Sequence, residues 1–159
     1  MTVTVYRLAK LRYQKQIFSG IGGLHAHGRW TWRRLPVVYT SESISLAVLE
    51  YALNYRRRGW VPASVLGRAT VPDDVAIELV DVTGLPRRWS DPDPPPELRE
   101  IGQDWLDRGR TAVLKVPSAV IVEEWNYLLN PQHADFGKLV WGKSRQFQFD
   151  PRLARTRKR

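Results

Sequence analysis

The stretch from residue 44 to about residue 57 constrains the fold most, because it predicts a helix with few polar positions. Ser41, Glu42 and Ser43 offer side-chain oxygens and an acid where a helix should begin, and Gly59 is placed to end it. Apolar residues cover nearly all sides of this helix: Leu46, Ala47, Val48, Leu49, Tyr51, Ala52, Leu53 and Tyr55. We therefore expect a central, buried helix.

Segments rich in β-branched and apolar residues predict strands at residues 2–8, 36–40, 65–71, 75–80, 111–116, 118–122 and 147–149. We expect 65–71 to pair with 75–80 across the turn at 72–74, and Pro117 to interrupt the strand around it. A second helix should start at Pro96 or Glu97 and end near Gly109, with Leu98, Ile101, Trp105 and Leu106 on its inner face. Residues 19–29 and 90–96 are expected loops, rich in glycine and proline respectively. The pattern predicts a single compact α+β domain.

The composition excludes several classes of protein. With 159 residues the chain has the usual size of one domain, and its hydrophobic content of 43% is enough for a core. It contains no cysteine, which excludes a disulfide framework, a catalytic thiol and any thiolate metal site. It has neither the basic start and apolar run of a signal peptide nor about 18 consecutive apolar residues. We therefore expect a cytoplasmic protein without a membrane span.

The chain is strongly basic, with a formal net charge of +9. Such a protein attracts something negative, which can be nucleic acid, a phosphorylated small molecule or an acidic protein. Part of this excess lies in residues 154–159, which we predict to be a basic tail, solvated or bound to a partner, after a domain of residues 1–153.

Four polar residues stand in contexts that are unusual for the surface: Arg29, Tyr39, Glu50 and Ser118. Glu50 is the most informative, because the neighbouring positions on its helical face include Leu46, Ala47 and Leu53. A buried carboxylate must meet a cation, a hydrogen-bond network or a ligand cavity. A structural salt bridge to Arg29 or to another arginine is the simplest of these solutions.

The other three residues have ordinary explanations when each is taken alone. Arg29 carries a planar fork of donors suited to a diphosphate or a carboxylate, but a loop arginine is commonly solvated. Tyr39 can pack in the core with its hydroxyl bonded, or stack on a heteroaromatic ring. Ser118 follows Pro117 and can be a turn residue.

The sequence does not predict a metal site. His25, His27, His133 and Asp135 are residue types that bind metals, but their spacing is unspecific. The glycines at 20, 22 and 23 do not form the strand-to-helix fingerprint of a Rossmann or P-loop nucleotide site.

Several short motifs follow one another in a specific order: Val5-Tyr6-Arg7-Leu8, Gly28-Arg29-Trp30, Tyr39-Thr40-Ser41-Glu42-Ser43, Val48-Leu49-Glu50, Val116-Pro117-Ser118, Glu124-Trp125-Asn126 and Phe147-Gln148-Phe149. Their order and spacing resemble those of the RES family, which is named for an arginine, a glutamate and a serine. The resemblance spans nearly the whole chain. It departs from the family pattern at Thr31, where asparagine is common.

The resemblance implies an enzyme that degrades NAD on a fold similar to the ADP-ribosyltransferase core, with mixed and antiparallel strands around a split cleft. It implies that Glu50 holds the ribose and stabilises its positive charge, while Arg29 grips the diphosphate. Tyr39 would close over the nicotinamide, and Ser118 would orient Glu50 or the ribose. Further contacts to NAD are expected from Tyr6, Arg7, Gly28, Ser41 and Asn126. No cofactor is expected beyond NAD as the substrate. Three acceptors remain open: water, inorganic phosphate as a co-substrate, or a protein side chain, which would make the chain a protein ADP-ribosyltransferase.

The resemblance also implies a partner. Members of the family are toxins of type II toxin–antitoxin systems, silenced by an antitoxin with an Xre-like helix-turn-helix portion, so nucleic acid would be contacted only through the antitoxin. A homodimer is a family-level expectation. The alternative from composition alone is a non-catalytic nucleic-acid-binding module, which the basic charge and the many aromatic residues favour but which gives no reason for Glu50.

Overall fold

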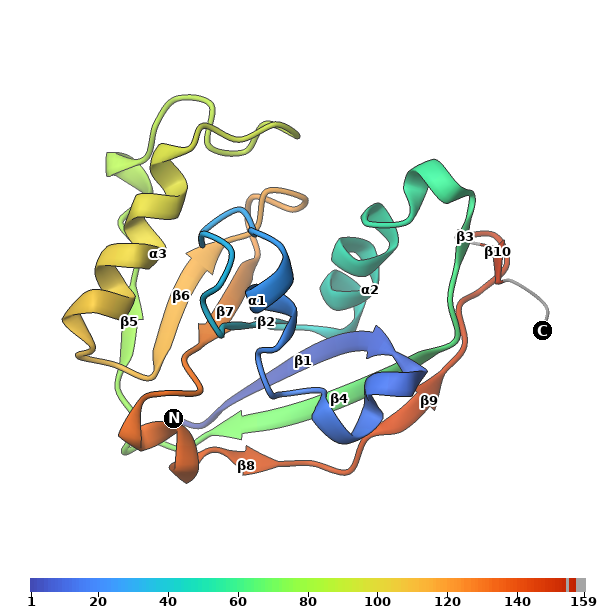
Figure 1. Ribbon diagram of the computed structural model, residues 1–159, viewed down its shortest axis with the longest axis horizontal. Helices are drawn as coiled ribbons and strands as arrows, with labels where there is room; N and C mark the ends of the chain where they lie inside the picture. Colours follow the sequence, from blue (N-terminus) through green and yellow to red (C-terminus); the bar gives the residue numbers. More distant parts are fainter. Residues whose placement is uncertain (154, 157–159) are drawn as a thin grey trace.

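Strand β1 (Val3–Lys10) lies near the middle of the sheet in the computed structural model, which describes residues 1–153, 155 and 156 (Figure 1). It pairs antiparallel along its whole length with β4 (Ser64–Val71). On its other edge it meets β2 (Val38–Ser41) at one pair among the described residues, Tyr6 and Ser41. The sheet is therefore nearly divided between β1 and β2.

The divided sheet has eight strands. One part contains β5 (Ile77–Leu79), β6 (Val113–Pro117), β7 (Trp125–Leu129) and β2, in that order. The other contains β1, β4 and β8 (Val140–Trp141), and β9 (Arg145–Phe147) also pairs with β4. Only β5 and β6 are parallel within this sheet of the described residues. The α+β class and the mixed sheet around a split are confirmed.

The helices cover different parts of the sheet (Figure 1). Helix α2 (Ile44–Leu53) packs on β1 and β2, and α3 (Glu97–Arg108) buries Leu98 and Trp105 against β6 and β7. The short helix α1 (Gly22–His25) lies between them in this view. The remaining elements are four 3₁₀ turns and a small parallel sheet: Leu11–Gln16, Arg56–Arg58, Val82–Gly84 and Ala134–Lys138, with β3 (Trp60–Val61) paired to β10 (Arg155–Thr156).

Helix α2 begins as predicted, because the Ser43 hydroxyl accepts a hydrogen bond from the amide of Leu46 at 3.0 Å. It ends at Leu53, four residues earlier than predicted, and the chain continues through a 3₁₀ turn to Gly59 in the left-handed conformation. The prediction that this helix is buried on nearly all sides is wrong. Leu49 and Leu53 are 38% and 46% exposed, because the sheet covers only one side of the helix.

Two strand predictions are wrong. The segment 65–71 does not pair with 75–80, because β1, β8 and β9 occupy both edges of β4, while β5 crosses to the far edge beside β6. Residues 118–122 form a turn, since the Ser118 hydroxyl accepts the amides of Val120 and Ile121 at 3.0 and 3.2 Å. The last strand of the sheet is present, but it covers 145–147, two residues earlier than the predicted 147–149.

Other predictions are confirmed within one or two residues. Helix α3 has the expected limits, and Gly109 ends it with a positive φ of 54°. The N-terminal strand and the strand before α2 are also present. Among the described residues, no helix is long and apolar enough to span a membrane. The predicted tail at 154–159 lies outside the described residues, except for the two that form β10.

Candidate functional site

A cleft of about 680 Å³ opens where the sheet is divided. Its walls come from β1, β2, α1 and α2, from the loop that carries Gly28 and Arg29, and from the loop that carries Ser90 and Pro92. Eight of the nine predicted site residues line it: Tyr6, Arg7, Gly28, Arg29, Tyr39, Ser41, Glu50 and Asn126. Ser118 is fully buried just behind the cleft.

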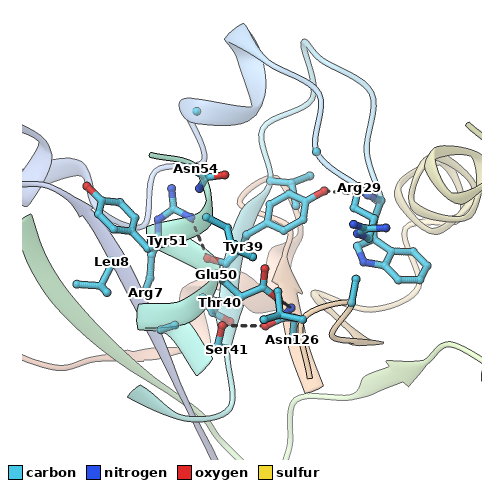
Figure 2. A pocket seen from close by; sticks show the side chains of 18 of the residues that line it. Arg7, Leu8, Arg29, Tyr39, Thr40, Ser41, Glu50, Tyr51, Asn54 and Asn126 are labelled. Atoms are coloured by element: carbon cyan, nitrogen blue, oxygen red, sulfur yellow. Dashed lines mark hydrogen bonds between the residues drawn. The ribbon is translucent and has the colours of Figure 1, made fainter. Parts of the chain in front are cut away.

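Glu50 projects from α2 toward the ends of β2 and β7 (Figure 2). Its Oε1 accepts two hydrogen bonds, from Ser118 Oγ at 2.9 Å and from Asn126 Nδ2 at 2.7 Å. Ser41 Oγ in turn donates to Asn126 Oδ1 at 2.8 Å. Oε2 accepts no hydrogen bond from a described residue, so this oxygen is left for a ligand.

Of the alternatives open for the Glu50 carboxylate, the structure shows a hydrogen-bond network and not a structural salt bridge. No described arginine or lysine forms an ion pair with Glu50, whose partners are neutral donors. The register of the sheet explains this arrangement. Asn126 on β7 lies opposite Ser41 on β2, and Ser118 directly follows β6, the other neighbour of β7. The end of β6 and strand β7 therefore bring two donors to one carboxylate oxygen, and Ser41 on β2 fixes one of these donors, Asn126.

Arg7 places a cation on the cleft wall formed by β1 (Figure 2). Its Nη1 donates to the carbonyl of Tyr39 at 2.8 Å, while its Nε is buried and has no partner among the described residues. Burial lowers the pKa of the Arg7 guanidinium, and the nearby Tyr51 only partly opposes this. A buried cation without a carboxylate partner favours an anion in the cleft.

Arg29 is held by backbone carbonyls of a distant loop. Its Nη1 donates to Trp89 O at 2.7 Å and to Asp91 O at 2.9 Å. Burial lowers the pKa of Arg29, whereas the negative charges of Glu50 and Asp91 raise it. Arg29 thus contributes positive charge near Glu50 but already uses one of its terminal nitrogens.

Tyr39 is tied to the loop that carries Gly28. Its hydroxyl lies 2.7 Å from Thr31 Oγ1 and accepts the amide of Trp30 at 3.3 Å. Burial raises the pKa of Tyr39 to about 12. Gly28 packs directly against this hydroxyl, and a Cβ at that position would overlap it. The ring of Tyr39 lines the cleft, while its hydroxyl fixes the loop.

Sequence reasoning missed two contributors to the cleft. Thr31 was noted only as a departure from the family pattern, yet it is fully buried and bonds the Tyr39 hydroxyl. The loop with Ser90 and Pro92 was expected to be irregular but not to form a cleft wall. No sequence signal identifies this wall, because it is held through the carbonyls of Trp89 and Asp91, which every residue type has.

The histidines do not form a metal site within the described part of the chain, where no group of three metal-binding side chains occurs. His27 lines the cleft, and His133 accepts the amide of Asp135 at 3.0 Å in a local turn. The chemistry available in the cleft is therefore that of a carboxylate with one free oxygen, three arginines, Arg7, Arg29 and Arg56, and several neutral donors. Such a set can hold an anion and stabilise positive charge on a nearby carbon.

Comparison with known protein families gives a match to the RES domain over residues 4–150. A protein named Toxin Res from Photorhabdus laumondii is 34% identical over 155 residues, which cover 97% of this chain and 99% of that protein. A protein from Sphingobium sp. named Prs ADP-ribosylating toxin is 33% identical over 160 residues, covering 98% and 99%.

Among solved structures, the Mycobacterium tuberculosis MbcT–MbcA toxin–antitoxin complex contains a similar chain. The TM-score is 0.77 at 18% sequence identity, with 92% of this chain and 85% of that chain covered. At this identity the likeness establishes a shared fold.

Proposed function

The chain belongs to the RES domain family, and we propose that it is the toxin of a toxin–antitoxin pair and acts by cleaving the nicotinamide–ribose bond of NAD. The names of its relatives support the toxin role, since three full-length or nearly full-length matches are called toxins. The observation that carries the proposed chemistry is Glu50, whose Oε1 is held by Ser118 and Asn126 while Oε2 stays available in the cleft.

Glu50 acts on the ribose in this proposal. When the bond between ribose C1′ and the nicotinamide nitrogen breaks, its electron pair leaves with nicotinamide, and C1′ gains oxocarbenium character. A carboxylate that already points into the cleft stabilises this charge without reorganising. Ser118 and Asn126 fix one oxygen of Glu50, so that the other can accept a hydrogen bond from a ribose hydroxyl.

Arg7 and Arg29 hold the diphosphate side of NAD. Arg7 is the stronger candidate for direct contact, because its Nη2 makes no hydrogen bond to a described residue and can donate to a phosphate oxygen, whereas its Nη1 is bonded to the Tyr39 carbonyl. Arg29 adds positive charge from the opposite wall, although its Nη1 is bonded to the loop. The ring of Tyr39 provides an apolar surface for the nicotinamide, with Tyr6 and Ser41 completing the wall near the division of the sheet.

The acceptor for C1′ distinguishes the detailed versions of this function. Water gives hydrolysis and loses one proton as its bond to C1′ forms. Inorganic phosphate gives phosphorolysis through an oxygen that is already anionic, and a protein nucleophile gives ADP-ribosylation and releases the proton that it carries, if it carries one. The relative named Prs ADP-ribosylating toxin favours the protein acceptor as a second candidate.

The test is nicotinamide release from NAD by the purified protein, with and without inorganic phosphate, followed by identification of the ribosyl product. Free ADP-ribose supports hydrolysis, and a phosphorylated ADP-ribose formed only with phosphate supports phosphorolysis. Label from adenine-labelled NAD that becomes attached to added proteins supports ADP-ribosylation. Absence of nicotinamide release under all three conditions contradicts the proposed chemistry.

The partner of this toxin would be a cognate antitoxin, of the Xre-like type that the family resemblance implies. The likeness to a chain of the MbcT–MbcA toxin–antitoxin complex supports such an assembly. The basic surface of the chain, with its net charge of +9, would speed encounter with an acidic antitoxin segment. Equimolar antitoxin should abolish nicotinamide release, and release that continues in a formed complex would contradict inhibition by the partner.

A further inference from the structure

The loop from Trp89 to Pro92 forms one wall of the cleft although it belongs to neither part of the sheet. Ser90 and Pro92 line the cleft, and Ser90 is partly buried. The Ser90 hydroxyl makes no hydrogen bond to another described residue. A polar group in this position is available to a ligand.

Arg29 holds this loop on both sides of Ser90. The two hydrogen bonds from its Nη1 end on the carbonyls of residues 89 and 91, at 2.7 and 2.9 Å. Within the loop, the amide of Trp89 bonds to Pro86 O at 2.9 Å, and Arg88 Nε lies 2.6 Å from an oxygen of Asp91. The position of Ser90 is thus determined by a short turn and by one arginine from the opposite loop.

The loop that carries Arg29 is itself anchored on α3. Arg99 Nε donates to Gly28 O at 3.2 Å, and Trp32 Nε1 donates to Glu100 Oε1 at 3.2 Å. Gly102 packs directly against the carbonyl of Trp30, where no side chain would fit. Helix α3 therefore supports Arg29, and Arg29 supports the wall that carries Ser90.

We propose that the Ser90 hydroxyl binds the nicotinamide–ribose half of the substrate and that Arg29 is the positioning residue that holds Ser90 in place. The inference rests on the proposed function. The assignment to this half of NAD follows from the contacts of the wall: Trp30, the neighbour of Arg29, donates to the hydroxyl of Tyr39, whose ring is the proposed surface for the nicotinamide, and Ser90 lines the same cleft. Both hydroxyls and the carboxamide of that half can hydrogen-bond to a serine.

The kinetic test compares Ser90→Ala, Arg29→Ala and the double variant. Loss of one neutral hydrogen bond should raise KM for NAD about fivefold in Ser90→Ala, with kcat changed less than about twofold. Arg29→Ala should raise KM at least as much, and the double variant should match Arg29→Ala because the two residues act through one wall. Ser144→Ala and Arg33→Ala, outside the cleft, should keep the wild-type KM.

The structural test is independent of turnover. Trypsin should cut after the exposed Arg87 and Arg88 faster in Arg29→Ala than in wild type, because the loop is released. Arg29→Lys, whose ammonium group can donate to both carbonyls, should retain most of the protection. Ser90→Ala should be protected like wild type.

Three results would overturn different parts of this proposal. A wild-type KM in Ser90→Ala, or additive effects in the double variant, overturns it while leaving NAD cleavage intact. Unchanged trypsin cleavage in both Arg29 variants overturns the positioning role. Absence of NAD turnover in the wild-type protein overturns the proposed function and the role of Ser90 with it.

Discussion

Removal of the Asn126 side chain should reduce the catalytic activity that depends on Glu50 much more than it reduces the stability of the fold. Asn126 lies on β7, whose backbone pairs with β2 and β6 whatever the side chain. Its Nδ2 donates to Glu50 Oε1 at 2.7 Å, and its Oδ1 accepts from Ser41 Oγ at 2.8 Å. Asn126→Ala therefore frees Glu50 to rotate and leaves the buried Ser41 hydroxyl without its acceptor.

The expected magnitude follows from the type of bond. A hydrogen bond to a charged group contributes about 1.5–3 kcal/mol. If the whole of this hydrogen-bond energy stabilises the transition state, Asn126→Ala should lower kcat/KM for nicotinamide release by about 10- to 100-fold. The free energy of unfolding should fall by about 1 kcal/mol, because one hydroxyl loses its partner.

Asn130→Ala is a matched control on the same part of the chain. Asn130 directly follows β7, is buried, and accepts the amide of Gln132 at 3.0 Å, but it does not line the cleft. It should lose a similar amount of stability and keep kcat/KM within about twofold. The reasoning is refuted if Asn126→Ala remains folded and retains the activity of the control.

Three further predictions concern stability and are checked by denaturant or thermal unfolding. Gly28→Ala should destabilise the protein by about 1–3 kcal/mol and reduce NAD turnover, because a Cβ would overlap the Tyr39 hydroxyl; an unchanged midpoint would mean that this loop has room. Gly102→Ala should cost at least as much by pushing α3 from the carbonyl of Trp30, whereas Gly137→Ala, with open space around it, should be nearly neutral. Above pH 10 the unfolded chain loses the Tyr39 proton, while the folded protein, in which the pKa of Tyr39 is about 12, retains it. The unfolding free energy should therefore fall by about 1.4 kcal/mol per pH unit between pH 10 and 12 from this group, and a Tyr39→Phe variant with an equally steep decline would contradict the assignment.

Local signals in the sequence predicted the elements that carry the site. Ser43 marks the start of α2 through its own hydrogen bond, and Gly109 ends α3 by adopting a positive φ. These features depend on a few neighbouring residues. The prominence of Glu50 among apolar residues also led to the cleft, because burial of a carboxylate demands partners.

The pairing of distant segments could not be predicted in the same way. Strand β7 was missed because it is enclosed between β2 and β6 and shows no simple alternation of apolar and polar residues. A salt bridge to an arginine was the simplest explanation for Glu50 taken alone, whereas the register of three strands brings Ser118 and Asn126 to it. Arg29 likewise bonds to carbonyls at residues 89 and 91, which have no signature in the sequence.

Nicotinamide release by the variant Glu50→Gln tests the central claim most directly. Glutamine keeps the size of the side chain and an oxygen that can accept from Ser118 and Asn126, but it removes the negative charge. With folding verified by an unfolding curve, the account predicts a loss of about 100-fold or more in kcat, because the charge stabilises the ribosyl cation. A folded Glu50→Gln protein that releases nicotinamide at the wild-type rate would contradict the role of this carboxylate.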